Sequence, residues 1–473
     1  MTSFILYDIT FLVLFSLITA IFLYRRRKNL QRQGLLYLYR TKVGIKFIEW
    51  TSSRYPNALK KLQYVVVGCG YVLMVSMVYL LIKFSWVYIT SPFAAKAIKI
   101  PIIMPLVPYL PEIFKLDFLP SFYFTYWIIV IAVIAIPHEF AHGIFASLNK
   151  VKIHATGFGF LGPFLAAFVE PDEKEMEKIK KFPQLSILAA GTFANILMTI
   201  LFGVIFWLFF ISAFSPAGVV FNSYASALVP VSSISEVNGV NITSNEGILD
   251  LIDEKSNFTE VEISGQSGEK FFVSSSNFKA LVESNSKNVI VIFDSPAFQN
   301  KLADAITEID GTPIRSIDDL SDVIDAHNPG DEIKIKTIGK NGDEKIISLK
   351  LGENEGNAYL GIRFLSQSGK GINGWIYTTL SKIKDPFIYY HSYLGDFGWF
   401  IYYLLWWIVL VNISVALANM LPLGIFDGGK FFYLTVWGIT GRRKIAERAF
   451  KISTYSILIL VAVLMIRWVF IFI

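Results

Sequence analysis

The residues with the clearest chemical potential are two histidines four positions apart, His138 and His142, with Glu139 beside the first in "PHEFAH". In a helix, residues four apart lie on one face, so both imidazoles can bind a single metal ion. Glu139 points about a quarter turn away, where it can take a proton from an attacking water without becoming a ligand. The pattern therefore predicts a Zn²⁺ centre that hydrolyses a bond.

The flanks of this motif, in "VIAIPHEFAHGIFA", are as apolar as a membrane span. The same spacing arises by chance in many proteins, mostly on solvated helices. An ionisable side chain inside a transmembrane helix is costly, however, and is by default a candidate for a functional site. Because two of the five histidines stand in the motif, we favour a metal centre over chance.

A catalytic zinc ion takes three protein ligands and leaves one position open for water. Asp427, in "LPLGIFDGGKFF", is the candidate at a matching depth, because the apolar runs that contain His138 and precede Asp427 cross the bilayer in the same direction. "DGG" is also a common turn signal, so a structural role for Asp427 is the alternative. The other histidines are less well placed, in a polar loop, in a soluble-type region and before the fifth apolar run: His154, His327 and His391.

The composition is that of an integral membrane protein: 54% of the 473 residues are hydrophobic and only 17% are charged. Cys69 is the single cysteine, so the chain forms no internal disulfide. Crossing a bilayer takes about 20 apolar residues. Six runs of this length predict a polytopic α-helical membrane protein, near 3–24, 63–90, 121–149, 184–213, 396–422 and 451–472.

The basic residues predict the orientation of these spans. The first run is followed at once by "RRRK" and further lysines and arginines up to residue 61. Because such residues accumulate in cytoplasmic loops, we expect this loop in the cytoplasm and the N-terminus outside. Alternation then places 150–183 and 423–450 in the cytoplasm, 214–372 outside, and the histidine motif near the cytoplasmic side of the bilayer.

Residues 214–372 have a different composition, with 23 acidic and 13 basic side chains and alternating strand patterns. This inserted α+β region also repeats itself, because "ISEVNGVNITS" at 234–244 aligns with "ITEIDGTPIRS" at 306–316. The second copy resembles the circularly permuted bacterial PDZ fold. We expect two PDZ-like modules, about 214–290 and 291–367; the alternative is a single domain with an elaboration.

Taken together, these motifs resemble the site-2 proteases, which are intramembrane zinc metalloproteases. The family's HExxH stands at His138, Glu139 and His142. A second motif, asparagine, proline and Asp-Gly at fixed spacing, stands at Asn419, Pro422, Asp427 and Gly428. A third pattern, glycine followed four residues later by asparagine, stands in "LAAGTFANILM" and ends at Asn195.

The resemblance implies roles for these residues. It assigns zinc binding to the two histidines and Asp427, and general-base catalysis to Glu139. Asn195 would be catalytic, holding the substrate backbone or stabilising the oxyanion, with an interhelical hydrogen bond as the alternative. The second motif places three further residues beside the substrate: Asn419, Pro422 and Gly428.

The stretch "GFGFLG" at 157–162 matches the dinucleotide fingerprint GxGxxG only weakly, since no βαβ unit surrounds it. Alternation of glycine and phenylalanine favours a hairpin at the membrane near the metal. In the family, a sheet in this region is thought to pair with an unwound substrate segment, which strand addition would stabilise. A purely structural loop is the alternative.

The chain is thus predicted to be a zinc metalloendopeptidase that cleaves within transmembrane segments. The resemblance implies single-span membrane proteins, trimmed first by another protease, as substrates; the lipid bilayer is the other partner, and no nucleic acid is expected. A metal-ion transporter or channel using the same three ligands is the rival function, and a non-catalytic scaffold is a second. We expect four parts: a first span with its basic loop (1–62), a membrane core with the HExxH helix (63–213), the PDZ-like region (214–372) and a second membrane core with the Asp-Gly motif (373–473).

Overall fold

The computed structural model describes residues 2–33, 36–91, 106–114, 116, 119–161, 164–241, 258–263, 270–274, 287–339, 342–365, 378, 381 and 383–472. The chain forms two compact units. The first unit contains residues 1–210 and 399–473, and the second contains residues 211–398.

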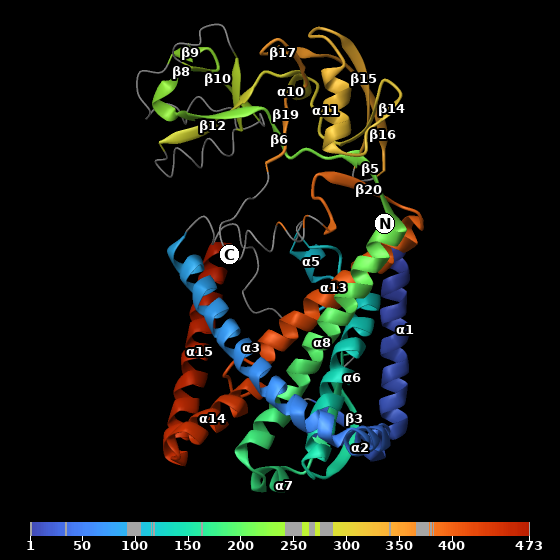
Figure 1. Ribbon diagram of the computed structural model, residues 1–473, viewed down its shortest axis with the longest axis vertical. Coiled ribbons are helices and arrows are strands. Elements are labelled where there is room, and N and C mark those ends of the chain that lie inside the picture. Colours follow the sequence, from blue (N-terminus) through green and yellow to red (C-terminus); the bar gives the residue numbers. More distant parts are fainter. Residues whose placement is uncertain are drawn as a thin grey trace. The chain divides into compact units, whose positions relative to one another are not determined.

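Six helices are long and apolar enough to cross a membrane, which confirms the predicted polytopic helical fold. Each overlaps one of the six apolar runs (Figure 1). They are α1 (Thr2–Arg26), α3 (Pro56–Thr90), α6 (Phe124–Leu148), α8 (Lys181–Ala213), α13 (Gly395–Asn419) and α15 (Arg443–Phe472). Shorter helices join them: α2 (Ile45–Arg54), α5 (Leu110–Ile113), α7 (Glu173–Lys178) and α14 (Asp427–Thr440).

The main core of the first unit lies among α3, α6, α8 and α14. It contains Phe145 of α6, Ala189 and Ala190 of α8, and Phe431 of α14, all buried. Small residues at these contacts allow helix backbones to approach closely, which is the usual packing mode of membrane helices. The helix that carries the histidines is therefore held between α3 and α8.

The start of α6 is fixed by a carboxylate from α1. Asp8 is only 2% exposed and accepts the backbone N–H of Phe124 at 2.8 Å and of Thr125 at 2.9 Å. It also accepts the hydroxyls of Thr125 and Tyr109. The first N–H groups of a helix lack partners within the helix and carry partial positive charge, so Asp8 caps α6 from another span.

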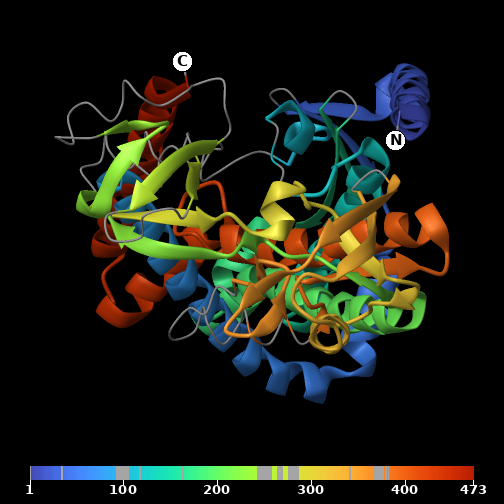
Figure 2. The same cartoon turned by 90° about the horizontal axis from the view of Figure 1, so that it is seen from above.

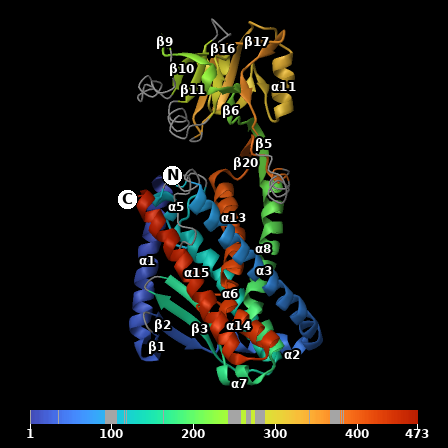
Figure 3. The same ribbon diagram turned by 90° about the vertical axis from the view of Figure 1, so that its left-hand side faces the viewer.

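A four-stranded antiparallel sheet lies beside α1 and α6 (Figure 3). Its order is β1-β2-β3-β4, and the bounds are β1 (Leu30–Gln33), β2 (Leu36–Thr41), β3 (Ile153–Leu161) and β4 (Phe164–Pro171). The Gly-Phe stretch forms the end of β3, while residues 162 and 163 are outside the described part. A Cβ on Gly157 would lie 2.2 Å from the carbonyl oxygen of Tyr39, so this strand passes β2 too closely for a side chain.

The second unit is rich in strands, which appear in green, yellow and orange in Figure 2. One sheet has the order β7-β12-β11-β10-β8-β9 and another has the order β16-β15-β13-β5-β20, with β14 paired to β13. The bounds are β5 (Phe214–Val219), β6 (Ser223–Tyr224), β7 (Ser226–Pro230), β8 (Ile234–Val237), β9 (Val240–Asn241), β10 (Phe258–Ile263), β11 (Phe271–Ser274), β12 (Asn288–Phe293), α10 (Pro296–Gln299), β13 (Ala305–Ile309), β14 (Thr312–Pro313), α11 (Ile317–Asp325), β15 (Glu332–Ile338), β16 (Glu344–Lys350), β17 (Gly352–Asn354), β18 (Asn357–Tyr359), β19 (Ile362–Arg363) and β20 (Ile388–Ser392).

The two sheets repeat one pattern of strand pairing. The hairpin β8–β9 turns at Asn238 and Gly239, with φ of 50° and 81°, and β13–β14 turns at Asp310 and Gly311, with φ of 47° and 83°. Two positive φ angles are the signature of a type I′ turn, which Asn-Gly and Asp-Gly favour. In each sheet the longer strand then pairs with an antiparallel hairpin, β10–β11 or β15–β16. The helix after the second copy is α11, whereas the matching stretch 245–253 lies outside the described residues.

Candidate metal centre and active site

Three side chains from two helices converge on one point. His138 and His142 of α6 place their Nε2 atoms 3.1 Å apart. The Oδ2 atom of Asp427, the first residue of α14, lies 3.5 Å from Nε2 of His138 and 3.4 Å from Nε2 of His142. Within the described part of the chain, no other three His, Cys, Asp or Glu side chains form such a cluster.

These separations fit a zinc ion. With metal–ligand bonds of about 2.0–2.1 Å, two ligands of a tetrahedral site lie about 3.3–3.4 Å apart. The three measured distances bracket that value, and two imidazoles with a carboxylate are a usual donor set for catalytic zinc. Three protein ligands also leave the fourth position for water or substrate.

The far nitrogens of both imidazoles are held by α8. Nδ1 of His142 lies 2.7 Å from the carbonyl oxygen of Ile187, and Nδ1 of His138 lies 3.1 Å from the amide of Asn195. Both contacts leave Nε2 facing the shared point. Gly191 lies between these two residues on α8, and a Cβ there would be 2.3 Å from Nε2 of His142 and 2.6 Å from Nε2 of His138. The glycine thus leaves room for the imidazoles where α8 approaches α6.

Asp427 is placed by a break in the chain. The sequence suggested a helix continuing to about residue 422, but α13 ends at Asn419 and a separate helix, α14, begins at Asp427. Pro422 explains the break, because proline lacks a backbone N–H and disfavours helical backbone in the residue before it. A Cβ on Gly428 would lie 2.4 Å from the backbone of Met420, so α14 packs its first turn tightly on the end of α13. The partial positive charge of a helix N-terminus favours the carboxylate there.

Comparison with known families supports the same chemistry. A family model described as Peptidase family M50 matches residues 126–464, from the start of α6 to within α15. The chain belongs to peptidase family M50. It is an intramembrane metalloprotease with a His-His-Asp metal site and a zinc requirement, as the sequence motifs predicted. No protein among the curated ones matches the chain.

In this M50 protease, Glu139 contacts the four-stranded sheet. Its Oε2 atom accepts the backbone N–H of Val169 on β4 at 3.0 Å. Glu139 is half-buried, whereas the adjacent His138 is 7% exposed. The contact brings the edge of β4 next to the histidine motif. The local sequence did not indicate this bond between Glu139 and Val169.

One amide of the second motif, that of Asn419, lies beside the cluster. Nδ2 of Asn419 lies 3.5 Å from Nε2 of His138, on the side that faces the shared point. Pro422 is buried, and its carbonyl oxygen accepts the hydroxyl of Ser453 at 2.8 Å. Asn419 is therefore close enough to contact a group bound at the cluster, while Pro422 and Gly428 are occupied by packing within the chain.

Several groups lie away from this site. His154 pairs with Asp172 at 3.0 Å, and His327 lies 3.4 Å from Asp310. Asp8, which caps α6, had one signal in the sequence: an acidic residue within the first apolar run. Gly191 also had a signal in the sequence, because it stands four residues before Asn195 in the third pattern.

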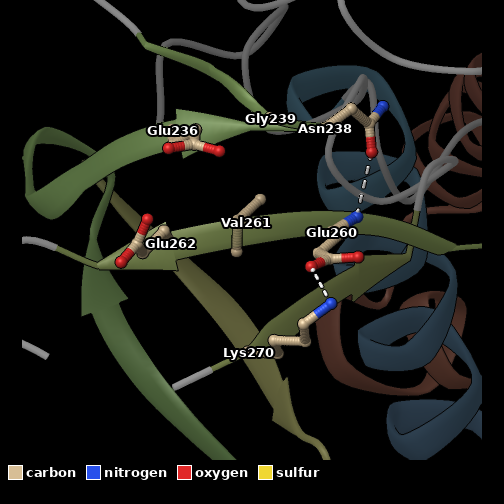
Figure 4. Close-up of a pocket in the computed structure, with 7 residues that line it drawn as sticks. All are labelled: Glu236, Asn238, Gly239, Glu260, Val261, Glu262 and Lys270. Atoms are coloured by element: carbon tan, nitrogen blue, oxygen red, sulfur yellow. Dashed lines mark hydrogen bonds and ion pairs between the residues drawn. The ribbon is translucent and has the colours of Figure 1, made fainter. Parts of the chain in front are cut away.

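A pocket in the second unit lies over β8, β10 and β11 (Figure 4). It holds about 240 Å³ and is lined by Glu236, Asn238, Gly239, Glu260, Val261, Glu262 and Lys270. Lys270 pairs with Glu260 at 2.9 Å, and the side-chain oxygen of Asn238 accepts the backbone N–H of Glu260. Lys270 and Asn238 thus both bond to Glu260, and none of the lining residues belongs to the metal cluster.

Proposed function

We propose that this protease hydrolyses peptide bonds within the transmembrane segments of single-span membrane proteins, using His138, His142 and Asp427 as the zinc ligands. The observation that carries the proposal is the convergence of these three groups at distances that suit one ion. When bound there, zinc lowers the pKa of a coordinated water and polarises the scissile carbonyl.

Glu139 is the general base. It follows His138 directly on α6, and its carboxylate lies at the edge of β4 rather than among the ligands. From this position it takes the proton of the attacking water and passes it to the leaving nitrogen. The carboxylate must turn away from the N–H of Val169 for this step.

The substrate pairs with the outer edge of β4. The N–H of Val169 bonds to Glu139, so it points away from β3, and in a strand the residues at 165 and 167 expose their backbone groups on the same side. A peptide bond in a helix hides its carbonyl in the helical hydrogen bonds. Strand addition at β4 satisfies the backbone groups freed by unwinding and brings the extended segment next to the zinc ligands.

Asn419 binds the scissile carbonyl. Its amide nitrogen is a hydrogen-bond donor close to the cluster, and a donor placed where negative charge develops stabilises the transition state. Pro422 and Gly428 serve this site indirectly, because their packing positions Asp427 and Asn419 at the junction of α13 and α14.

The orientation and the inserted region complete the proposal. The basic loop after α1 faces the cytoplasm by the positive-inside rule, so the N-terminus and the strand-rich region lie outside and the zinc ligands lie toward the cytoplasmic side. The repeated hairpins support two PDZ-like modules, which either bind the new C-terminus of a substrate trimmed by another protease or exclude by their bulk substrates that are not yet trimmed. Release of membrane-anchored proteins after a first cut is the implied role.

The test is cleavage by the purified protein in detergent. A panel of tagged single-span substrates is incubated with wild type, with Glu139→Gln and with wild type plus a chelator. Fragments cut within the transmembrane segment, produced only by the untreated wild type, support the proposal. The proposal would be overturned in favour of a transporter by two results together. The wild type would cleave no substrate, and the Glu139→Gln variant would still move metal ions across liposome membranes.

A further inference from the structure

Asn195 and Asn419 contact opposite nitrogens of the same imidazole. Asn195 is fully buried on α8 and places its amide 3.1 Å from Nδ1 of His138. Asn419 lies near Nε2, the nitrogen that faces the cluster. The ring of His138 therefore stands between the two amides, and only the amide of Asn419 is on the ligand side.

Metal binding determines which nitrogen of the imidazole carries the proton. A neutral histidine that binds a metal through Nε2 holds its proton on Nδ1, and Nδ1 must then donate to an acceptor. His142 has such an acceptor in the carbonyl oxygen of Ile187. For His138 the group at Nδ1 is the amide of Asn195.

The amide of Asn195 can supply that acceptor through its oxygen. Oδ1 is buried and has no partner among the described residues, and a half-turn of the amide exchanges it with Nδ2. The two ends of an amide are assigned from the hydrogen bonds they make. Either orientation leaves one end of the amide without a protein partner. Only Oδ1 can accept an N–H, so a His138 tautomer with its proton on Nδ1 selects the orientation in which Oδ1 faces Nδ1.

We propose that Asn195 is a positioning residue that holds His138 in the tautomer and ring orientation needed for zinc binding, and that it does not touch the substrate. It acts from behind the ring, as Ile187 does for His142. The inference rests on the proposed zinc ligands, but it changes the role of Asn195 from oxyanion stabiliser to support of a ligand.

The experiment measures metal affinity separately from cleavage. Zn²⁺ affinity is determined by competition with a chelating dye for purified wild type, Asn195→Leu and Asn195→Asp, and the Co²⁺ absorption spectrum reports ligand geometry. Asn195→Leu should weaken zinc binding by about 10- to 100-fold, the usual effect of removing such a partner. Asn195→Asp keeps an acceptor for the N–H and should restore affinity and spectrum.

The matched control is Asn412→Leu, which removes a fully buried asparagine from a different helix, α13. Asn412 lies two turns before Asn419, about 10 Å along the helix, so its loss should leave zinc affinity unchanged. If Asn195→Leu does not fold, Asn195→Ala is compared with Asn195→Asp in the same way.

If Asn195→Leu bound zinc as tightly as wild type but lost cleavage, the inference would be wrong. Asn195 would then be assigned to substrate binding or oxyanion stabilisation. Equal losses of affinity in the Leu and Asp variants would also overturn it. The affinities are measured without substrate, so a wild type that binds zinc but cleaves no peptide would refute the proposed function alone.

Discussion

The carboxylate of Glu139 accepts the backbone N–H of Val169 at 3.0 Å, which ties the proposed general base to the edge strand β4. A substrate segment that pairs with β4 would present a carbonyl to the same N–H. In the proposed mechanism, substrate and general base would therefore compete for one backbone N–H, and strand pairing would release the carboxylate for catalysis.

Replacing Glu139 by glutamine should leave zinc in place and abolish cleavage. The amide oxygen can still accept the N–H of Val169, so the local fold is retained, but the amide cannot take a proton. We expect cleavage to fall by about 10²- to 10⁴-fold, the usual contribution of a general base. Zinc content per protein and the rate of fragment release measure the two effects. Activity within tenfold of wild type would contradict this role.

Chelation should reversibly inactivate the protease. Removing zinc takes away the group that the three ligands hold, and adding Zn²⁺ back should restore cleavage. Asp427→Ala leaves only the two imidazoles and should not recover on zinc addition, because a catalytic site needs three protein ligands. Recovery of this variant to wild-type rates at equal zinc would show that Asp427 is not a ligand.

Gly191→Ala should prevent zinc binding without unfolding α8. The new methyl group would lie 2.3 Å from Nε2 of His142, where the ion and its ligands must be. The control is Gly203→Ala on the same helix, where a Cβ meets nothing within 4 Å. Alanine is the better helix former by about 0.5–1 kcal/mol, so the control should bind zinc normally with equal or higher thermal stability. Full zinc occupancy in Gly191→Ala would disprove the steric argument.

Asp8→Asn should destabilise the first unit and lower activity, although Asp8 lies on α1 and contacts the start of α6, at the opposite end from the histidines. The asparagine amide offers one acceptor and turns its own N–H groups toward donors. Leaving a buried donor without a partner costs about 1–3 kcal/mol. The thermal midpoint in detergent measures this loss, with Thr10→Ala at the exposed face of α1 as the control. Tyr109→Phe removes a single bond to Asp8 and should cost less, about 1 kcal/mol. An unchanged midpoint in Asp8→Asn would show that the cap does not hold α6.

Much of this protein follows from its sequence, because the relevant rules are local. Hydropathy predicted the six spans, since any helix that crosses a bilayer must be apolar over its whole length. Helical periodicity placed His138 and His142 on one face, and the repeated Asn-Gly and Asp-Gly turns predicted matching hairpins. Asp427 required a further argument from depth and from the resemblance to a family, because it lies far from the histidines along the chain.

Only the tertiary structure decided which groups meet across elements. The break at Pro422 and the new helix at Asp427, the cap that Asp8 places on α6, and the approach of Gly191 to the imidazoles depend on how separate helices pack. The bond between Glu139 and Val169 and the position of Asn195 behind His138 are contacts of the same kind. The periodicity of one segment specifies which of its faces is buried, but the partner of that face is set by packing with segments distant in sequence.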